Sequence, residues 1–294
     1  MPACLIVSPA EASASVPTAD RLHVVDPALP QVSVTDLGVT RGDGIFEVLG
    51  VVDGHPQAVD AHLRRLAVSA AMLDLPALDL DAFRAAIHQV VAAFDEPHRE
   101  YSVKIIVTRG IEGSGVATAW VLAFKSADDY AVERQTGVSV VLLERGYPHD
   151  IASRAPWLLA GAKTLSYAVN KAVLREAARR GAQDVVFTSS DGYVLEGPSA
   201  SLIVKHGRHI WTPSTSQGIL RGTTQAAAFE FFADAGYATS EVLLRIDQLW
   251  DADALWLTSS GRMLVPVREL DGRPITVDRE LTDAGNAALL ARTR

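Results

Sequence analysis

Cysteine is almost absent from this 294-residue chain, in which Cys4 is the single thiol. A disulfide framework and a cysteine-based zinc cluster are therefore excluded within one chain. Such low cysteine content fits a reducing compartment, and we expect a cytoplasmic protein.

The sequence also lacks a basic excess and a long apolar run. Its 27 Lys and Arg residues face 35 acidic residues, which gives a net charge of -8 and argues against a nucleic-acid partner. Near the N-terminus the only apolar run covers residues 3–7 and no basic residue precedes it, so it does not resemble a secretory signal. No stretch approaches the ~20 apolar residues that a membrane-spanning helix needs, and we expect no membrane partner.

Several common catalytic motifs are missing as well. The chain contains no HExxH or CxxC pattern, no GxxxxGKS or GxxxxGKT phosphate loop and no GxSxG nucleophile elbow. These absences argue against a zinc enzyme, a P-loop nucleotide-binding protein and an α/β-hydrolase. We expect no bound metal.

What is present indicates an ordinary globular protein of two domains. Hydrophobic residues make up 48% of the chain and charged residues 21%, and its length suits two packed domains. We expect a mobile extension at 1–20, a small α/β domain at 21–124, a polar linker at 125–136 and a larger domain at 137–294. Strands and helices are mixed without strict βαβ order, which predicts the α+β class.

Local patterns place the elements that matter for function. Residues 45–52 read as a strand that ends at the turn signal Asp53-Gly54, and apolar residues at helical spacing predict a helix at 61–74. A second helix is predicted at about 165–180, ending at Gly181, and a third begins near Gly222.

A set of polar residues at the ends of these elements suggests covalent chemistry with a phosphorylated cofactor. Lys163 stands between an apolar run and a helix start, where burial would let it lose its proton and form a Schiff base. Glu196 directly follows a β-run, a costly place for a carboxylate without a cationic partner. Possible phosphate ligands are Thr223 and Thr224 at a helix start, Ser259 and Ser260 at a strand end, and Arg65 on the 61–74 helix. Taken alone, Lys163 also fits a surface lysine at a strand end, and the two threonines also fit a plain helix cap.

Seven short segments follow one another in a distinctive order. They are GDGIFE (42–47), HLRRL (62–66), VTRG (107–110), AGAKTLSYAVN (160–170), DGYVLEGPSASL (191–202), ILRGTT (219–224) and TSS with PV (258–267). Their order resembles the class IV pyridoxal-phosphate family, and the match covers about residues 32–272. That family contains branched-chain aminotransferases, D-amino-acid aminotransferases and 4-amino-4-deoxychorismate lyases.

The resemblance implies a fold type IV enzyme, with a smaller N-terminal α/β domain and a larger, mixed β-barrel-like C-terminal domain with helices. It also implies a homodimer that binds pyridoxal 5'-phosphate in a cleft between the two domains. Lys163 would hold the cofactor and later move a proton, while Glu196 would pair with the pyridine nitrogen. The other implied contacts are phosphate binding by Arg65, Thr223, Thr224, Ser260 and also Ser259, ring packing by Leu220 and a site-lining position for Tyr167. Periodicity does not choose between Arg64 and Arg65, and only the motif selects Arg65; Tyr167 is otherwise an ordinary core residue.

The segments around the lysine and the 191–192 turn resemble the lyase branch, which releases 4-aminobenzoate and pyruvate for folate biosynthesis. Arg109, Arg221 and Arg262 lie within the motif segments and would suit a substrate with two carboxylates, although each is otherwise a surface arginine. Two features depart from the family pattern. Residues 110–120 lack the second arginine that many members carry after the TRG motif, and Arg262 stands where small or hydroxylated residues are usual.

Three alternatives remain open at this point. The first is a transaminase acting on a D-amino acid, a branched-chain amino acid or an amine. The second is a hydrolase in which Ser166 is the nucleophile and Lys163 the base, because their three-residue separation would bring them together on a helix. The third is a pyridoxal-phosphate-binding protein without catalytic activity.

Overall fold

The computed structural model describes residues 3–7, 21–95, 99–126 and 130–293. The chain divides into two compact units. The N-terminal unit comprises residues 1–127, 162–167 and 292–294, and the C-terminal unit comprises 128–161 and 168–291. Both units combine a sheet with helices, so the predicted α+β class is confirmed. Within the described ranges, no helix is both long and apolar enough to cross a membrane.

The N-terminal unit is built on a six-stranded sheet in the order β2-β1-β6-β5-β3-β4, and every neighbouring pair is antiparallel. Buried and partly exposed residues alternate along β6 and in the first part of β3, as in a sheet with one covered face. The two hairpin residues Asp53 and Gly54 both have positive φ, which matches the predicted tight turn after β3. The strands are β1 (Ala3–Val7), β2 (Leu22–Val25), β3 (Gly44–Val52), β4 (His55–Pro56), β5 (Glu100–Thr108) and β6 (Thr118–Phe124).

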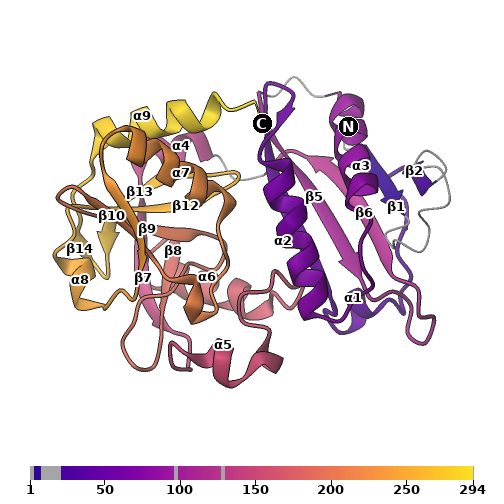
Figure 1. The fold of residues 1–294 in the computed structure, drawn as a ribbon, viewed down its shortest axis with the longest axis horizontal. Coiled ribbons are helices and arrows are strands. Elements are labelled where there is room, and N and C mark those ends of the chain that lie inside the picture. Colours follow the sequence, from indigo (N-terminus) through magenta and orange to yellow (C-terminus); the bar gives the residue numbers. More distant parts are fainter. Residues whose placement is uncertain (1–2, 8–20, 96–98, 127–129, 294) are drawn as a thin grey trace. The chain divides into compact units, whose positions relative to one another are not determined.

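Two helices cover one face of this sheet (Figure 1). Helix α2 (Val59–Met72) packs on β3, and α3 (Leu80–Ala93) packs on β1 and β6. Leu63 and Leu66 lie in the buried stripe of α2, at the spacing that predicted an amphipathic helix at 61–74, and Phe83 is buried on α3. A short helix, α1 (Leu37–Thr40), precedes β3 and is capped by the Asp36 side chain.

The C-terminal unit contains an eight-stranded mixed sheet in the order β11-β10-β9-β12-β13-β7-β8, with β14 paired to β13. The pairs β10–β11, β13–β7 and β7–β8 are parallel, and the other pairs are antiparallel. The strands are β7 (Val138–Glu144), β8 (Asp184–Thr188), β9 (Ser201–His206), β10 (His209–Pro213), β11 (Ala238–Val242), β12 (Ala254–Ser259), β13 (Met263–Leu270) and β14 (Arg273–Pro274).

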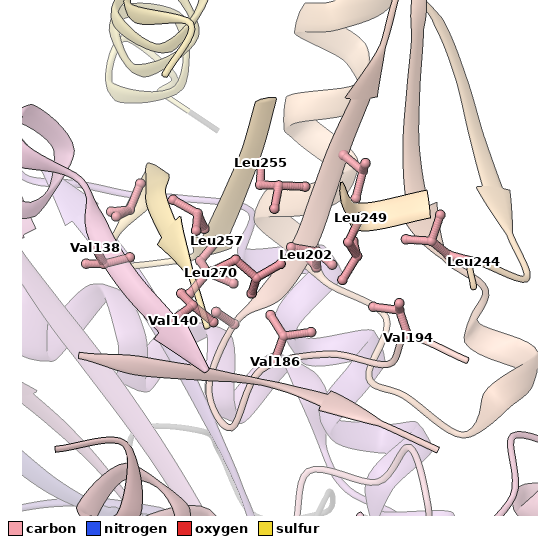
Figure 2. Close-up of a cluster of buried hydrophobic side chains, with 14 residues drawn as sticks. Val138, Val140, Val186, Val194, Leu202, Leu244, Leu249, Leu255, Leu257 and Leu270 are labelled. Carbon is pink, nitrogen blue, oxygen red and sulfur yellow. The ribbon is translucent and has the colours of Figure 1, made fainter. Parts of the chain in front are cut away.

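A continuous apolar core stabilises this sheet. Leu202 on one strand, Leu255 and Leu257 on a second and Val140 on a third meet Leu249 from a short helix, and all are almost fully buried (Figure 2). Burial of such side chains contributes about 1.5–3 kcal/mol each and makes this unit a rigid support for the loops at its strand ends. The helices of the unit are α4 (Tyr130–Thr136), α5 (Ile151–Arg154), α6 (Ala168–Arg179), α7 (Thr223–Asp234), α8 (Asp247–Trp250) and α9 (Arg279–Leu290), with 3₁₀ turns η3 (Pro156–Leu158) and η4 (Thr215–Gln217).

The structure differs from the expected domain limits at three places. Residues Ala3–Val7 of the expected extension form β1, because this apolar segment pairs with both β2 and β6; residues 8–20 lie outside the described part. Within the expected linker, Tyr130–Thr136 is the helix α4, which packs on β13 of the C-terminal unit. Residues Ala162–Tyr167, expected in the C-terminal domain, belong to the N-terminal unit.

Candidate active site

The backbone around Lys163 is held by two elements of the N-terminal unit. The Lys163 carbonyl accepts a hydrogen bond from the Phe46 amide at 3.0 Å, and the Leu165 amide donates to the Gly44 carbonyl at 2.8 Å. Residues 163–165 therefore pair with the edge of β3. The Lys163 amide donates to the Ser69 hydroxyl of α2 at 3.1 Å. Because the amide and the carbonyl of Lys163 are both hydrogen-bonded, its backbone is fixed between β3 and α2.

The Lys163 side chain lies over an aromatic ring. Its Nζ is 4.3 Å from the centroid of Phe46, and the Tyr167 ring meets the same Phe46 edge-on at 5.5 Å between centroids. The expected helix start at about 165 is wrong, because residues 163–165 pair with β3 and α6 begins only at Ala168. Ser166 therefore does not share a helical turn with Lys163, and its hydroxyl donates to the Gly42 carbonyl at 3.4 Å. In this described segment, Ser166 and Lys163 therefore do not lie together on a helix as the Ser-Lys hydrolase alternative requires.

Arg65 lies on α2 in the same unit and binds a buried carboxylate. Its Nε and Nη2 donate to Oε1 and Oε2 of Glu47 at 2.6 and 2.7 Å. Nδ1 of His62, one turn earlier on α2, lies 2.7 Å from the same Oε2. Burial alone would raise the pKa of Glu47, but the charge and hydrogen bonds of Arg65, together with the His62 bond, lower it to about 2. The carboxylate is therefore ionised at neutral pH. Arg64, the alternative left open by periodicity, is exposed on α2.

In the C-terminal unit, Glu196 ends an extended segment that pairs with β8. Its backbone carbonyl accepts from the Phe187 amide at 2.9 Å, which continues the pairing with β8. Its Oε1 accepts from the Leu220 amide at 3.1 Å, so the two predicted contacts Glu196 and Leu220 are neighbours.

Helix α7 begins next to this pair. Gly222 is its N-cap residue, and no side chain caps the helix within the described residues. A Cβ on Gly222 would stand 2.4 Å from the Ser201 hydroxyl oxygen, so only glycine lets the backbone approach β9 here. Thr223 opens the helix and Thr224 is buried in its first turn. The amide groups and positive dipole end of such a helix favour an anion.

The two serines stand at the end of β12. Ser259 is the last residue of the strand, and its hydroxyl accepts from the Arg262 amide at 3.4 Å. Ser260 follows in the turn that leads to β13, and both serines are partly exposed. Both serines therefore lie at a strand end, as the sequence predicted.

The three arginines predicted to bind substrate have different surroundings. Arg109 binds Asp43 through Nε at 2.6 Å and also donates to the Leu73 and Asp74 carbonyls, on one side of a cavity of about 400 Å³. Arg262 pairs with the buried Asp184 and with Glu133. Protein acceptors thus bind both of these guanidinium groups, as Glu47 binds that of Arg65. Arg221 lies between Leu220 and Gly222 and is exposed.

Each unit contains some of the kinds of group that pyridoxal phosphate needs. That cofactor needs an amine for its aldehyde carbon, an anion for its ring nitrogen, and N–H donors with a cation for its phosphate. The N-terminal unit supplies the amine of Lys163 and the cation of Arg65. The C-terminal unit supplies the Glu196 carboxylate and the start of α7 at Gly222.

Glu47 and His62, which meet at Arg65, both lie in the quoted motif segments, although the motifs give neither residue a role. Glu47 alternates with the inward residues Ile45 and Leu49 on β3, and all three are fully buried. A carboxylate in an inward position of an apolar strand indicates a buried partner, and this signal was available from the alternation alone. His62 carried no comparable signal, because a histidine on a helix is more often an ordinary surface or core residue.

Comparisons with known proteins agree with these features. The amino-transferase class IV family matches residues 44–270. A bifunctional aminodeoxychorismate lyase / D-amino acid transaminase from Mycobacterium tuberculosis is 42% identical over 276 residues, which cover 89% of this chain and 96% of that protein. A fold IV transaminase from Curtobacterium pusillum is 50% identical with a TM-score of 0.95 and full coverage of both chains. The PLP-bound form of a hypothetical aminotransferase from Mycobacterium tuberculosis is 39% identical with a TM-score of 0.88, covering 97% of this chain and 98% of that one.

Proposed function

Because this chain belongs to the class IV aminotransferase family and is a pyridoxal-phosphate-dependent enzyme, we propose that it converts 4-amino-4-deoxychorismate to 4-aminobenzoate and pyruvate. The observation that carries the proposal is the 42% identity to a bifunctional lyase and transaminase along nearly the whole chain. The lyase-like segments around Lys163 and the 191–192 turn support the same choice. The family, fold class and cofactor expected from the seven motifs are confirmed.

We propose cofactor roles for candidate residues in each unit. Bound pyridoxal phosphate supplies a covalent attachment point for the substrate amine and a ring that withdraws electrons from the adjacent carbon. Lys163 would bind the aldehyde carbon and then carry the proton that leaves and returns during turnover. Glu196 would keep the ring nitrogen protonated, and Leu220, held by Glu196 through its amide, would pack on the ring.

The phosphate contacts combine backbone and side-chain donors. We propose that the amides at the start of α7, the hydroxyls of Thr223, Thr224 and Ser260, and the Arg65 guanidinium bind this group. Ser259 is a further candidate because it is partly exposed at the same strand end. Tyr167 would line the site, since its ring and Lys163 Nζ share the Phe46 ring.

A second candidate function is transamination of a D-amino acid. It is favoured by the bifunctional relative, whose two activities include D-amino acid transamination. The two functions share the same first proton transfer by Lys163 and differ in whether an amino group passes to an acceptor keto acid. Branched-chain amino acids and amines are the remaining transaminase substrates.

One experiment separates the two functions. The purified enzyme is supplied with 4-amino-4-deoxychorismate and no keto acid, and pyruvate and 4-aminobenzoate are followed. Equal release of both products, abolished in Lys163→Ala, is the expected result. Turnover of D-alanine with 2-oxoglutarate, but none of 4-amino-4-deoxychorismate, would assign the chain to transamination instead.

The resemblance also leads us to propose a homodimer. Sedimentation of the 31.4 kDa chain at twice its monomer mass is the expected result, and an active monomer would contradict it.

A further inference from the structure

A carboxylate interrupts the apolar row on the covered face of β3. Glu47 lies between Ile45 and Leu49, and its cross-strand neighbour on β5 is Ile105. All four side chains are fully buried. An ionised carboxylate in such a place costs several kcal/mol unless it is paired and hydrogen-bonded, so this position serves something other than packing.

The carboxylate holds Arg65 side-on. Nε and Nη2 of the guanidinium bind the two oxygens of Glu47 at 2.6 and 2.7 Å. A bidentate contact of this kind fixes both the plane and the direction of the guanidinium, which a single hydrogen bond does not. The Arg65 side chain is only 13% exposed, so its long stem is confined as well.

His62 completes the arrangement from the same helix. Burial lowers the pKa of His62; the hydrogen bond and negative charge of Glu47 oppose this shift, and the positive charges of Arg65 and Lys163 add to it. Ionised Glu47 only accepts hydrogen bonds, so Nδ1 of His62 carries the proton and donates to Oε2 at 2.7 Å. Oε2 thus receives both His62 and Arg65, and neither oxygen of Glu47 is left without a donor.

We propose that Glu47 and His62 are positioning residues that orient the Arg65 guanidinium for the cofactor's phosphate group. This inference rests on the phosphate-binding role proposed above for Arg65. An arginine that is already oriented loses little side-chain freedom when the phosphate binds, and the binding is correspondingly tighter. Glu47 and His62 contact Arg65 rather than the phosphate, so their effect is limited to the phosphate end of the cofactor.

The test compares pyridoxal phosphate with pyridoxal, which lacks the phosphate. Both dissociation constants are measured on the cofactor-stripped, full-length enzyme by the visible absorbance of the lysine-bound ligand. In Glu47→Gln, which keeps the shape and removes the charge, the dissociation constant of pyridoxal phosphate is expected to rise about tenfold relative to that of pyridoxal, in line with the loss of a hydrogen bond to a charged group. Arg65→Met is expected to raise the ratio further, and adding Glu47→Gln to Arg65→Met is expected to change nothing more.

His62 provides a matched pair of variants. In His62→Asn the amide nitrogen can take the place of Nδ1 and donate to Glu47, so the ratio is expected to stay near the wild-type value. In His62→Leu this donor is lost, and the ratio is expected to rise several-fold. This pair decides the question by itself if Glu47→Gln does not fold, as shown by failure to bind pyridoxal.

Several results would overturn the proposal. A lower dissociation constant for pyridoxal phosphate in Glu47→Gln would mean that the carboxylate competes with phosphate for Arg65. Equal weakening of both ligands would mean a general structural role. An unchanged ratio in Arg65→Met would remove the phosphate role of Arg65, and the proposal with it. These assays contain no substrate, so a failure of the lyase assignment leaves their outcome intact.

Discussion

Replacement of Arg262 by methionine distinguishes a structural arginine from a substrate-binding one. Arg262 pairs with Asp184, whose side chain is 1% exposed, and with Glu133 at 3.0 Å; its own side chain is 13% exposed. Methionine keeps much of the apolar volume and removes the charge. The change leaves Asp184 as a buried carboxylate without its cationic partner.

The size of the effect follows from the burial of this pair. Loss of one partner from a buried ion pair costs about 3–5 kcal/mol, and the partial exposure of Arg262 places it near 3 kcal/mol. For a protein of this size each kcal/mol lowers Tm by roughly 2–4 °C, so Tm is expected to fall by roughly 6–12 °C. Adding Asp184→Asn to Arg262→Met should recover at least about 1 kcal/mol, because it removes the uncompensated charge.

Thermal unfolding and steady-state kinetics together provide the assay. The KM for the substrate is expected to stay within about twofold of wild type at a temperature where the variant is folded. Arg175→Met on the exposed part of α6 is the control and is expected to change stability by no more than about 0.5 kcal/mol. A large rise in KM with unchanged Tm would refute the reasoning and restore Arg262 as a substrate ligand.

Three further predictions address the cofactor and its surroundings. Lys163→Ala should lack the visible absorbance band that wild type shows with pyridoxal phosphate, and borohydride should fix the cofactor covalently in wild type alone; a covalent adduct in the variant would contradict the assignment. Gly222→Ala should weaken cofactor binding, because its Cβ would stand 2.4 Å from the Ser201 hydroxyl oxygen, and Ser201→Gly should partly restore it; unchanged binding in the single variant would show that α7 has room to move. The pKa of Glu47, about 2 in the folded state against an ordinary 4.5, means that its contribution to stability is complete above pH ~4.5 and is lost as the pH falls toward 2; acid unfolding of Glu47→Gln should therefore depend less steeply on pH in this window, and equal slopes would argue against the ion pair.

Local sequence patterns predicted much of the framework correctly. The turn at Asp53-Gly54, the amphipathic helix that carries Arg65 and the helix that begins after Gly222 all appear in the structure. Each depends on short-range physics: a positive φ, a 3.6-residue period, or a helix start. The limits of the extension and linker were less accurate, because β1 and α4 are stabilised by partners more than 100 residues away.

The sequence by itself determined the family, the cofactor and the candidate residues, because seven short motifs in one order are specific even when each is weak. Only the tertiary structure decided which partners these residues have. Lys163 belongs to the N-terminal unit because its segment pairs with β3. Arg262 forms an ion pair with Asp184, 78 positions away. Glu47 receives Arg65 and His62 because a helix packs on its strand. Motif order and periodicity report neighbours along the chain, whereas the pairing of buried charges depends on which distant groups are removed from water together.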